Sequence, residues 1–160
     1  MISWLNDQGS LTRRLVNLCG DAFSVRVLSQ QWVKPRFEEA QLLGAPPQQK
    51  ALLRQVQLLC DDQILVYARS VIPLATLDGP HRRLKYLRDK PLGGYLFANP
   101  SLKRSRQELA TIQRKDPLFS IALSDGSQAC ECIWGRRSLF VIDGKSLLVS
   151  EFFLPELVRE

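Results

Sequence analysis

The sequence predicts an α+β domain in which helices pack on one face of an antiparallel sheet. Two pairs of segments alternate between apolar and polar residues, 50–60 with 63–74 and 138–142 with 145–154, and each pair predicts a hairpin. An Asp-Gly dipeptide at 143–144 joins the second pair, which favours a type I′ turn. Short helical segments accompany the hairpins, so the class is α+β. The length of 160 residues predicts one domain over residues 1–160.

The remaining strands are less regular. Residues 23–29 alternate like a strand, residues 32–37 form a second extended segment, and residues 130–134 are strand-like. Residues 105–115 leave two interpretations open, because their composition tolerates a helix while their alternation also fits a strand.

Helices are expected at three places. Ser10 is a good N-cap for a helix over residues 11–19. Residues 80–89 have helical spacing, with leucines pointing inward and basic side chains forming a solvated face. Pro91 suits the first turn of a short helix.

The composition indicates a cytoplasmic globular protein. Apolar residues make up 45% of the chain, which is enough to fill a core. We expect no membrane segment, because no run of about 18 apolar residues occurs. The N-terminus lacks the basic and apolar regions of a signal peptide. The net charge of +6 permits nucleic-acid binding, but the basic residues are dispersed, and we expect no nucleic-acid partner.

The four cysteines, Cys19, Cys60, Cys130 and Cys132, fit no zinc-ligand spacing, and we expect reduced thiols in the core. No Gly-rich phosphate loop or Gly-x-Ser-x-Gly motif occurs, and the lone histidine, His81, lies in the exposed-looking basic helix. No carboxylate cluster suits a metal site. An enzyme with this sequence would therefore work without metal or cofactor, by positioning and electrostatics.

Two charged residues stand where strands should be apolar. Counting by twos places Arg54 with Leu52 and Val56, and Glu151 with Val149 and Phe153. A charge on a core-facing position is costly unless it is paired or serves a ligand. These residues suggest a pocket for an anionic small molecule with a polar far end. Two alternatives remain open: a buried salt bridge between Arg54 and Glu151, or a solvent-facing position for either.

Two helix starts are candidates for anion binding. The first N–H groups of a helix have no partner within it and can bind an anion. The expected helices begin near Leu11 and Leu92. Ordinary caps are far more common than ligand sites, so the two helix starts alone do not define a site.

Several short motifs occur along the chain in an order that is more specific than any one of them. They are Trp4-Leu5, Ser10-Leu11-Thr12-Arg13-Arg14, Leu53-Arg54-Gln55-Val56, Ala68-Arg69-Ser70-Val71-Ile72-Pro73, Pro91-Leu92-Gly93-Gly94-Tyr95-Leu96-Phe97, Trp134-Gly135-Arg136-Arg137-Ser138 and Leu147-Leu148-Val149-Ser150-Glu151-Phe152-Phe153-Leu154-Pro155. Together they resemble the chorismate lyase (4-hydroxybenzoate synthase) family over nearly the whole chain.

The resemblance implies a six-stranded antiparallel sheet with helices and an occluded ligand pocket. It also implies conversion of chorismate to 4-hydroxybenzoate and pyruvate, the first step of ubiquinone biosynthesis in bacteria, without a cofactor. We expect product inhibition and a monomer. The alternative is a sensor domain of the same fold that binds small aromatic acids without catalysis.

The resemblance carries residues of the family over to five positions of this chain. Arg54 matches the arginine that holds the ring carboxylate, and Leu11 and Leu92 match the two residues whose backbone N–H groups assist it. Glu151 matches the glutamate that meets the far hydroxyl, as a base or as a hydrogen-bond partner. Arg69 matches a second strand arginine, whose role in the site stays open. The resemblance therefore makes Arg54 and Glu151 the expected catalytic residues.

Overall fold

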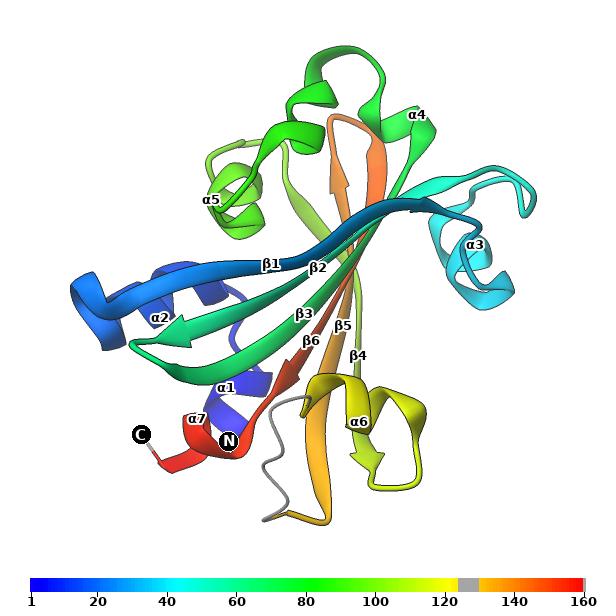
Figure 1. Ribbon diagram of the computed structural model, residues 1–160. Coiled ribbons are helices and arrows are strands. Elements are labelled where there is room, and N and C mark those ends of the chain that lie inside the picture. The colour runs from blue at the N-terminus through cyan, green and yellow to red at the C-terminus, as the bar shows by residue number, and fades with distance from the viewer. Residues whose placement is uncertain (124–129, 160) are drawn as a thin grey trace.

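The centre of the protein is a six-stranded sheet with the strand order β1-β2-β3-β6-β5-β4, in which every neighbouring pair is antiparallel (Figure 1). The structure is a computed structural model and describes residues 1–123 and 130–159. The strands are β1 (Phe23–Val33), β2 (Ala51–Cys60), β3 (Gln63–Pro73), β4 (Lys103–Gln113), β5 (Cys132–Ile142) and β6 (Lys145–Phe153). The predicted α+β class and the six-stranded antiparallel sheet are confirmed.

Nine short helical segments surround the sheet in the described part of the chain. They are α1 (Ile2–Leu5), α2 (Leu11–Cys19), η1 (Gly20–Ala22), α3 (Phe37–Leu43), α4 (Leu74–Leu77), η2 (Gly79–Tyr86), α5 (Leu92–Phe97), α6 (Pro117–Ala122) and α7 (Pro155–Arg159). None of them is long and apolar enough to cross a membrane.

Both predicted hairpins form. β2 pairs with β3 across a turn at Asp61, which has a φ of 53°. β5 pairs with β6 across Asp143 and Gly144, whose φ values of 49° and 74° are both positive, as a type I′ turn requires. Of the two interpretations of residues 105–115, the strand is correct, because the segment belongs to edge strand β4.

The segment 80–89 differs from its prediction. It forms the 3-10 helix η2 rather than an α-helix, and His81 is 3% exposed rather than solvated. His81 is held by the Tyr95 hydroxyl at 2.7 Å from Nδ1 and by Asp143 Oδ2 at 2.9 Å from Nε2. Sequence spacing showed the leucine stripe of this segment but not these polar partners, which come from α5 and the β5–β6 turn.

Helices cover both faces of the sheet, so the expectation that they lie on one face is wrong (Figure 1). Strands β2 and β3 are buried on both sides, which requires other elements to pack against both faces of the sheet. We call one side the α2 face; its strand residues include Arg54, Val56, Ala68, Arg136 and Glu151. The other is the α3 face; its strand residues include Leu53, Arg69, Gly135, Arg137 and Phe152.

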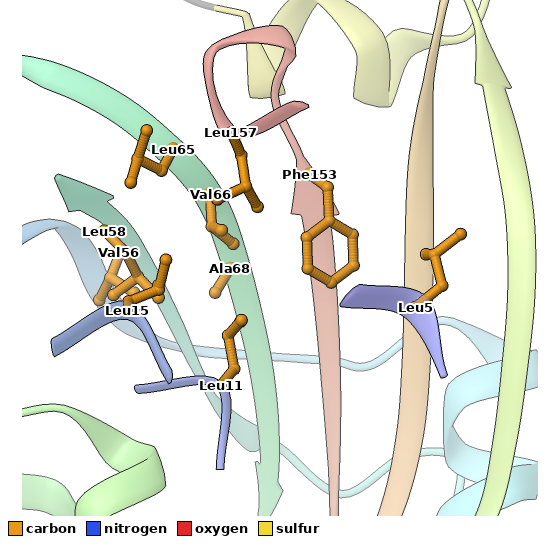
Figure 2. Packing of buried hydrophobic residues seen from close by; sticks show 10 residues of the cluster. All are labelled: Leu5, Leu11, Leu15, Val56, Leu58, Leu65, Val66, Ala68, Phe153 and Leu157. Carbon is orange, nitrogen blue, oxygen red and sulfur yellow. The ribbon is translucent and has the colours of Figure 1, made fainter. Parts of the chain in front are cut away.

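The α2 face is built around an apolar cluster that seats helix α2. Leu11 and Leu15 of this helix pack against Val56 and Leu58 of β2, and Ala68 of β3 lies beside them (Figure 2). Leu15 is fully buried. This packing fixes the start of α2 above the middle of the sheet.

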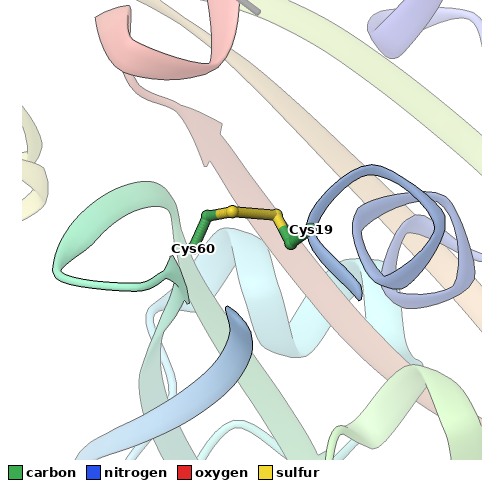
Figure 3. The surroundings of a disulfide bond; sticks show 2 residues. All are labelled: Cys19 and Cys60. Atoms are coloured by element: carbon green, nitrogen blue, oxygen red, sulfur yellow. A yellow bond between two sulfur atoms is a disulfide. The ribbon is translucent and has the colours of Figure 1, made fainter. Parts of the chain in front are cut away.

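A disulfide joins Cys19, at the end of α2, to Cys60, at the end of β2 (Figure 3). The expectation of four reduced thiols is therefore wrong for these two, while Cys130 and Cys132 are free. The Cα atoms of the bonded pair are 5.6 Å apart, in the usual disulfide range. The seating of α2 on the sheet brings together two cysteines that lie 41 positions apart in the sequence.

Candidate active site

The four predicted site residues lie together. Leu11 of α2, Arg54 of β2, Leu92 of α5 and Glu151 of β6 line one cavity between the two helices and the α2 face. Its other walls are largely apolar and include Val56, Leu58, Ala68, Leu96, Phe97, Phe140 and Val149. Apolar walls with a few convergent polar groups are typical of small-molecule sites.

The cavity is narrow in this structure, with a volume of about 50 Å³. A cavity of roughly 150 Å³ holds a benzene molecule. A ligand with an aromatic ring therefore requires the walls to move apart, and the two short helices α2 and α5 form the side that is not part of the sheet.

Arg54 is a buried cation that forms no ion pair with the described residues. It is 2% exposed and lies between Gln30 of β1 and Ser70 of β3. Its Nη1 donates to Gln30 Oε1 at 3.3 Å and its Nη2 donates to the Lys90 carbonyl at 2.9 Å. Burial lowers the pKa of Arg54, and the charge of Asp89 partly opposes this. Among residues 1–123 and 130–159, no carboxylate lies within salt-bridge distance of Arg54.

Glu151 does not pair with Arg54, which removes the alternative of a mutual salt bridge. Its Oε2 accepts a hydrogen bond from Arg136 Nε at 2.7 Å. Arg136 is 1% exposed, and its Nη1 donates to the carbonyls of Trp4 at 3.1 Å and Asp7 at 2.7 Å. Arg136 thus ties Glu151 to the loop between α1 and α2 and leaves Oε1 as the less occupied oxygen.

Sequence reasoning missed Arg136 as a site partner. Counting by twos along residues 134–140 places Arg136 on the same side as Trp134, Ser138 and Phe140. That pattern is the signal that identified Arg54 and Glu151, so Arg136 could have been found in the same way.

The two expected helix starts meet at the mouth of the cavity. Ser10 caps α2 as predicted, because its Oγ accepts from the backbone N–H of Arg13 at 3.2 Å. A Cβ added to Gly93 would lie 2.7 Å from Thr12 Oγ1, so only glycine lets α5 approach α2 this closely. The first N–H groups of both helices therefore lie near one another beside Leu11 and Leu92.

Arg69 lies outside this cavity, although it stands next to Ser70 in the sequence. It projects from the α3 face, where its Nη2 forms an ion pair with Glu39 Oε1 of α3 at 3.2 Å. The strand period of two explains this, because adjacent residues point to opposite faces.

Arg104 of β4 also lines the cavity, and sequence reasoning did not identify it. Its guanidinium carbon lies 4.9 Å from the centre of the Phe140 ring. Arg104 precedes the segment 105–115, whose sequence fits a helix or a strand, and a β-bulge between Arg104 and Arg106 breaks the alternation that would show its face.

Comparisons of the sequence and of the fold show which known proteins this chain resembles. The family model of chorismate lyase matches residues 1–160. A protein of Methylococcus capsulatus named "Probable chorismate pyruvate-lyase" is 44% identical over 99% of this chain and 96% of its own length. A protein of the same name from Aromatoleum aromaticum is 39% identical over 98% of this chain and 85% of its own length.

Solved structures with low sequence identity share the fold. The effector domain of PhnF from Mycobacterium smegmatis superposes with a TM-score of 0.70 at 13% identity, over 94% of this chain and 91% of its own. The effector-binding domain of the trehalose repressor of Bacillus subtilis gives 0.62 at 8% identity, over 81% and 89%. The family model that matches residues 1–160 and the relatives at up to 44% identity establish that this chain belongs to the chorismate lyase family.

Proposed function

We propose that this protein converts chorismate to 4-hydroxybenzoate and pyruvate. The observation that supports this most strongly is that Leu11, Arg54, Leu92 and Glu151 line the same cavity from four separate elements. Arg54 on β2 and Glu151 on β6 are separated by β3, so the cavity has a cation toward one end and an acid toward the other. A flat ring with a carboxylate at one end and a hydroxyl at the other matches this distribution.

In the proposed complex Arg54 holds the ring carboxylate, because guanidinium favours bidentate hydrogen bonds to carboxylates. The N–H groups of Leu11 and Leu92 assist at the helix starts. Glu151, fixed through Oε2 by Arg136, uses Oε1 to accept a hydrogen bond from the ring hydroxyl. Phe97, Phe140 and Val149 bound the ring on apolar surfaces.

The chemical step is an elimination. The bond between the ring carbon and the enolpyruvyl oxygen breaks, and its electron pair leaves with the enolpyruvate. The proton on the hydroxyl-bearing carbon is removed, and its C–H electron pair completes the aromatic ring. The enolpyruvate takes up one proton at its methylene carbon and becomes pyruvate. Aromatisation drives the reaction, so orientation and electrostatic stabilisation are the main contributions required of the protein.

Two roles of Glu151 can be separated by experiment. If Glu151 is the general base, Glu151→Gln lowers kcat by roughly 100-fold or more. If Glu151 only accepts a hydrogen bond, the isosteric amide can replace it, and kcat falls by less than about tenfold. The measurement is kcat for both forms under saturating chorismate.

The proposal extends to product release. A ring acid held at both ends in a narrow cavity leaves slowly, because the walls must separate first. We expect 4-hydroxybenzoate to inhibit competitively and a burst of product to precede the steady state. A linear time course with no inhibition by added 4-hydroxybenzoate would contradict slow release.

We also propose that the protein acts in the cytoplasm as a monomer, in the first step of ubiquinone biosynthesis, without a cofactor. The disulfide Cys19–Cys60 bears on the compartment, since disulfides are rare in reducing cytoplasm. Alkylation of intact cells before lysis, followed by mass spectrometry, tests whether these cysteines are bonded there.

The direct test of the activity is incubation of purified protein with chorismate in the presence of a chelator. The proposal expects 4-hydroxybenzoate and pyruvate to accumulate in equal amounts. No turnover but thermal stabilisation by 4-hydroxybenzoate would favour the sensor alternative, which the shared fold with regulator effector domains makes worth testing. A protein that neither turns over chorismate nor responds to 4-hydroxybenzoate would overturn both.

A further inference from the structure

Chorismate carries two carboxylates, and Arg54 accounts for only one of them. This inference rests on the proposed function. We propose that Arg104 binds the second carboxylate, the one on the enolpyruvyl group, and thereby lets the site distinguish the substrate from the product.

Arg104 lies at the correct end of the cavity. The enolpyruvyl ether is attached beside the hydroxyl-bearing carbon, so its carboxylate belongs near Glu151 rather than near Arg54. Arg104 lines the same cavity as Glu151, and its charge interacts with that of Glu151 and of Arg136. It reaches this place from edge strand β4, where its backbone pairs with Phe140.

The guanidinium of Arg104 has one edge free. Its Nη1 donates to the Asp7 carbonyl at 3.3 Å and to Gln8 Oε1 at 3.2 Å. Its Nε is buried and has no hydrogen-bond partner in the described part of the chain. The Nε and Nη2 groups form the side of the guanidinium that binds a carboxylate through two parallel hydrogen bonds. A buried donor without a partner costs free energy, and a bound carboxylate removes that cost.

The other arginine near Glu151 is less suited to this task. Arg136 gives its Nε to Glu151 and its Nη1 to the carbonyls of Trp4 in α1 and Asp7 in the following loop, and its Nη2, like the Nε of Arg104, is buried without a hydrogen-bond partner in the described part of the chain. It is absent from the cavity lining that contains Glu151 and Arg104. Arg136 therefore positions Glu151, and Arg104 remains as the cation that faces the ligand.

This assignment gives Arg104 a part in the reaction as well as in binding. As the C–O bond breaks, negative charge grows on the enolpyruvyl oxygen, next to the carboxylate that Arg104 holds. A fixed cation at that position stabilises the leaving group more than it stabilises the bound substrate. The product 4-hydroxybenzoate has lost the second carboxylate and gains nothing from Arg104.

The test uses this difference between the two ligands. Arg104→Met keeps an unbranched apolar stem and removes the guanidinium with its charge. We expect kcat/KM for chorismate to fall roughly 10- to 100-fold, while the Kd of 4-hydroxybenzoate changes less than about twofold. Arg104→Lys should recover part of the loss, because lysine restores the positive charge but lacks the two parallel N–H donors of a guanidinium group. Arg54→Met should weaken both ligands.

A matched control separates ligand binding from loop support. Gln107 Nε2 donates to the Leu5 carbonyl at 3.1 Å, so Gln107→Ala loosens the same loop that Arg104 contacts without changing the cavity lining. We expect Gln107→Ala to leave the kcat/KM for chorismate and the Kd of 4-hydroxybenzoate unchanged. The assignment is overturned if Arg104→Met leaves kcat/KM unchanged, weakens 4-hydroxybenzoate equally, or is reproduced by Gln107→Ala. Absence of turnover in the wild-type protein would instead overturn the proposed function.

Discussion

Arg54 on the α2 face differs from the two arginines that project from the middle of the α3 face, Arg69 and Arg137. On the α3 face, Arg69 pairs with Glu39, and Arg137 pairs with Glu108 at 2.6 Å and with Glu38 at 3.3 Å. On the α2 face, Arg136 pairs with Glu151 at 2.7 Å, but Arg54 has only neutral acceptors in the described part of the chain, the Gln30 amide oxygen and the Lys90 carbonyl. Among the described residues, Arg69 and Arg137 each have a carboxylate partner, and Arg54 does not. Burial does not explain this difference, because Arg54 is more deeply buried than either of them.

This contrast separates structural charge from charge that is available to a ligand. A buried ion pair is already neutralised, and breaking it destabilises the protein. A buried arginine without an acid keeps its charge for an anion that arrives later. Volume alone would favour the other face as a ligand site, because the cavity on the α3 face measures about 230 Å³ and the cavity beside Arg54 about 50 Å³. A buried arginine without an ion pair, rather than a large volume, is therefore the feature that favours the cavity beside Arg54 as the proposed site.

The largest expected effect comes from Arg54→Met. Loss of the cation that we propose as the partner of the ring carboxylate should lower kcat/KM by about 100-fold or more and weaken the binding of 4-hydroxybenzoate comparably, since a buried charge contact contributes about 2–5 kcal/mol. The thermal midpoint should stay or rise, because an unpaired buried charge is removed. Steady-state kinetics and calorimetric titration of 4-hydroxybenzoate measure these effects. A wild-type value of kcat/KM in this variant would show that the unpaired arginine does not serve the ligand.

The disulfide provides the next effect, on stability. Cys19 and Cys60 close a loop of 41 positions and tie α2 to the sheet, so the double variant Cys19→Ser, Cys60→Ser should lose about 2–4 kcal/mol of unfolding free energy. Urea unfolding with and without reductant measures the loss in the wild type. The matched control is Cys130→Ser, Cys132→Ser, which removes two free thiols and should respond to reductant as the wild type does.

Arg69→Met is the counterpart of Arg54→Met on the other face. It leaves Glu39, a residue that is 4% exposed, without its cation, and should cost about 1–3 kcal/mol of stability. The kcat/KM of the folded enzyme should stay within about twofold, because Arg69 does not line the cavity. A large loss of kcat/KM with normal stability would mean that Arg69 acts in the site and that the two faces do not divide as described.

The smallest expected effect is a difference in ligand affinity between alanine variants of two neighbouring glycines. Gly93→Ala brings a methyl group against Thr12 and should push the start of α5 away from α2, which weakens 4-hydroxybenzoate several-fold, or about 1 kcal/mol. Gly94→Ala meets nothing within 4 Å and should leave the Kd unchanged while raising helix propensity. Equal Kd values for the two variants would show that the approach of the two helix starts does not shape the site.

Much of this arrangement follows from local patterns in the sequence. Period-two counting correctly placed Arg54 and Glu151 with the buried apolar residues of their own strands, and Ser10 correctly marked the start of α2. The Asp-Gly pair at 143–144 correctly predicted a tight hairpin. These features depend on neighbouring residues and on strand geometry, so the sequence contains them directly.

The features that escaped prediction depend on distant contacts. Arg136 bonds Asp7 across 129 positions, and the Cys19–Cys60 disulfide spans 41. Burial of His81 depends on Tyr95 and on Asp143. Arg104 was hidden by a β-bulge that interrupts the alternation of its strand. Side-chain partners that come from other elements become visible only after the chain has folded.

The orientation of the ring acid is the central claim, and a crystal structure with bound 4-hydroxybenzoate tests it most directly. We predict that the ligand's carboxylate lies at the Arg54 guanidinium, that its hydroxyl lies at Glu151 Oε1, and that α2 and α5 have moved apart to admit the ring. A reversed ligand, or one bound in the cavity of the α3 face beside Arg69 and Arg137, would contradict it.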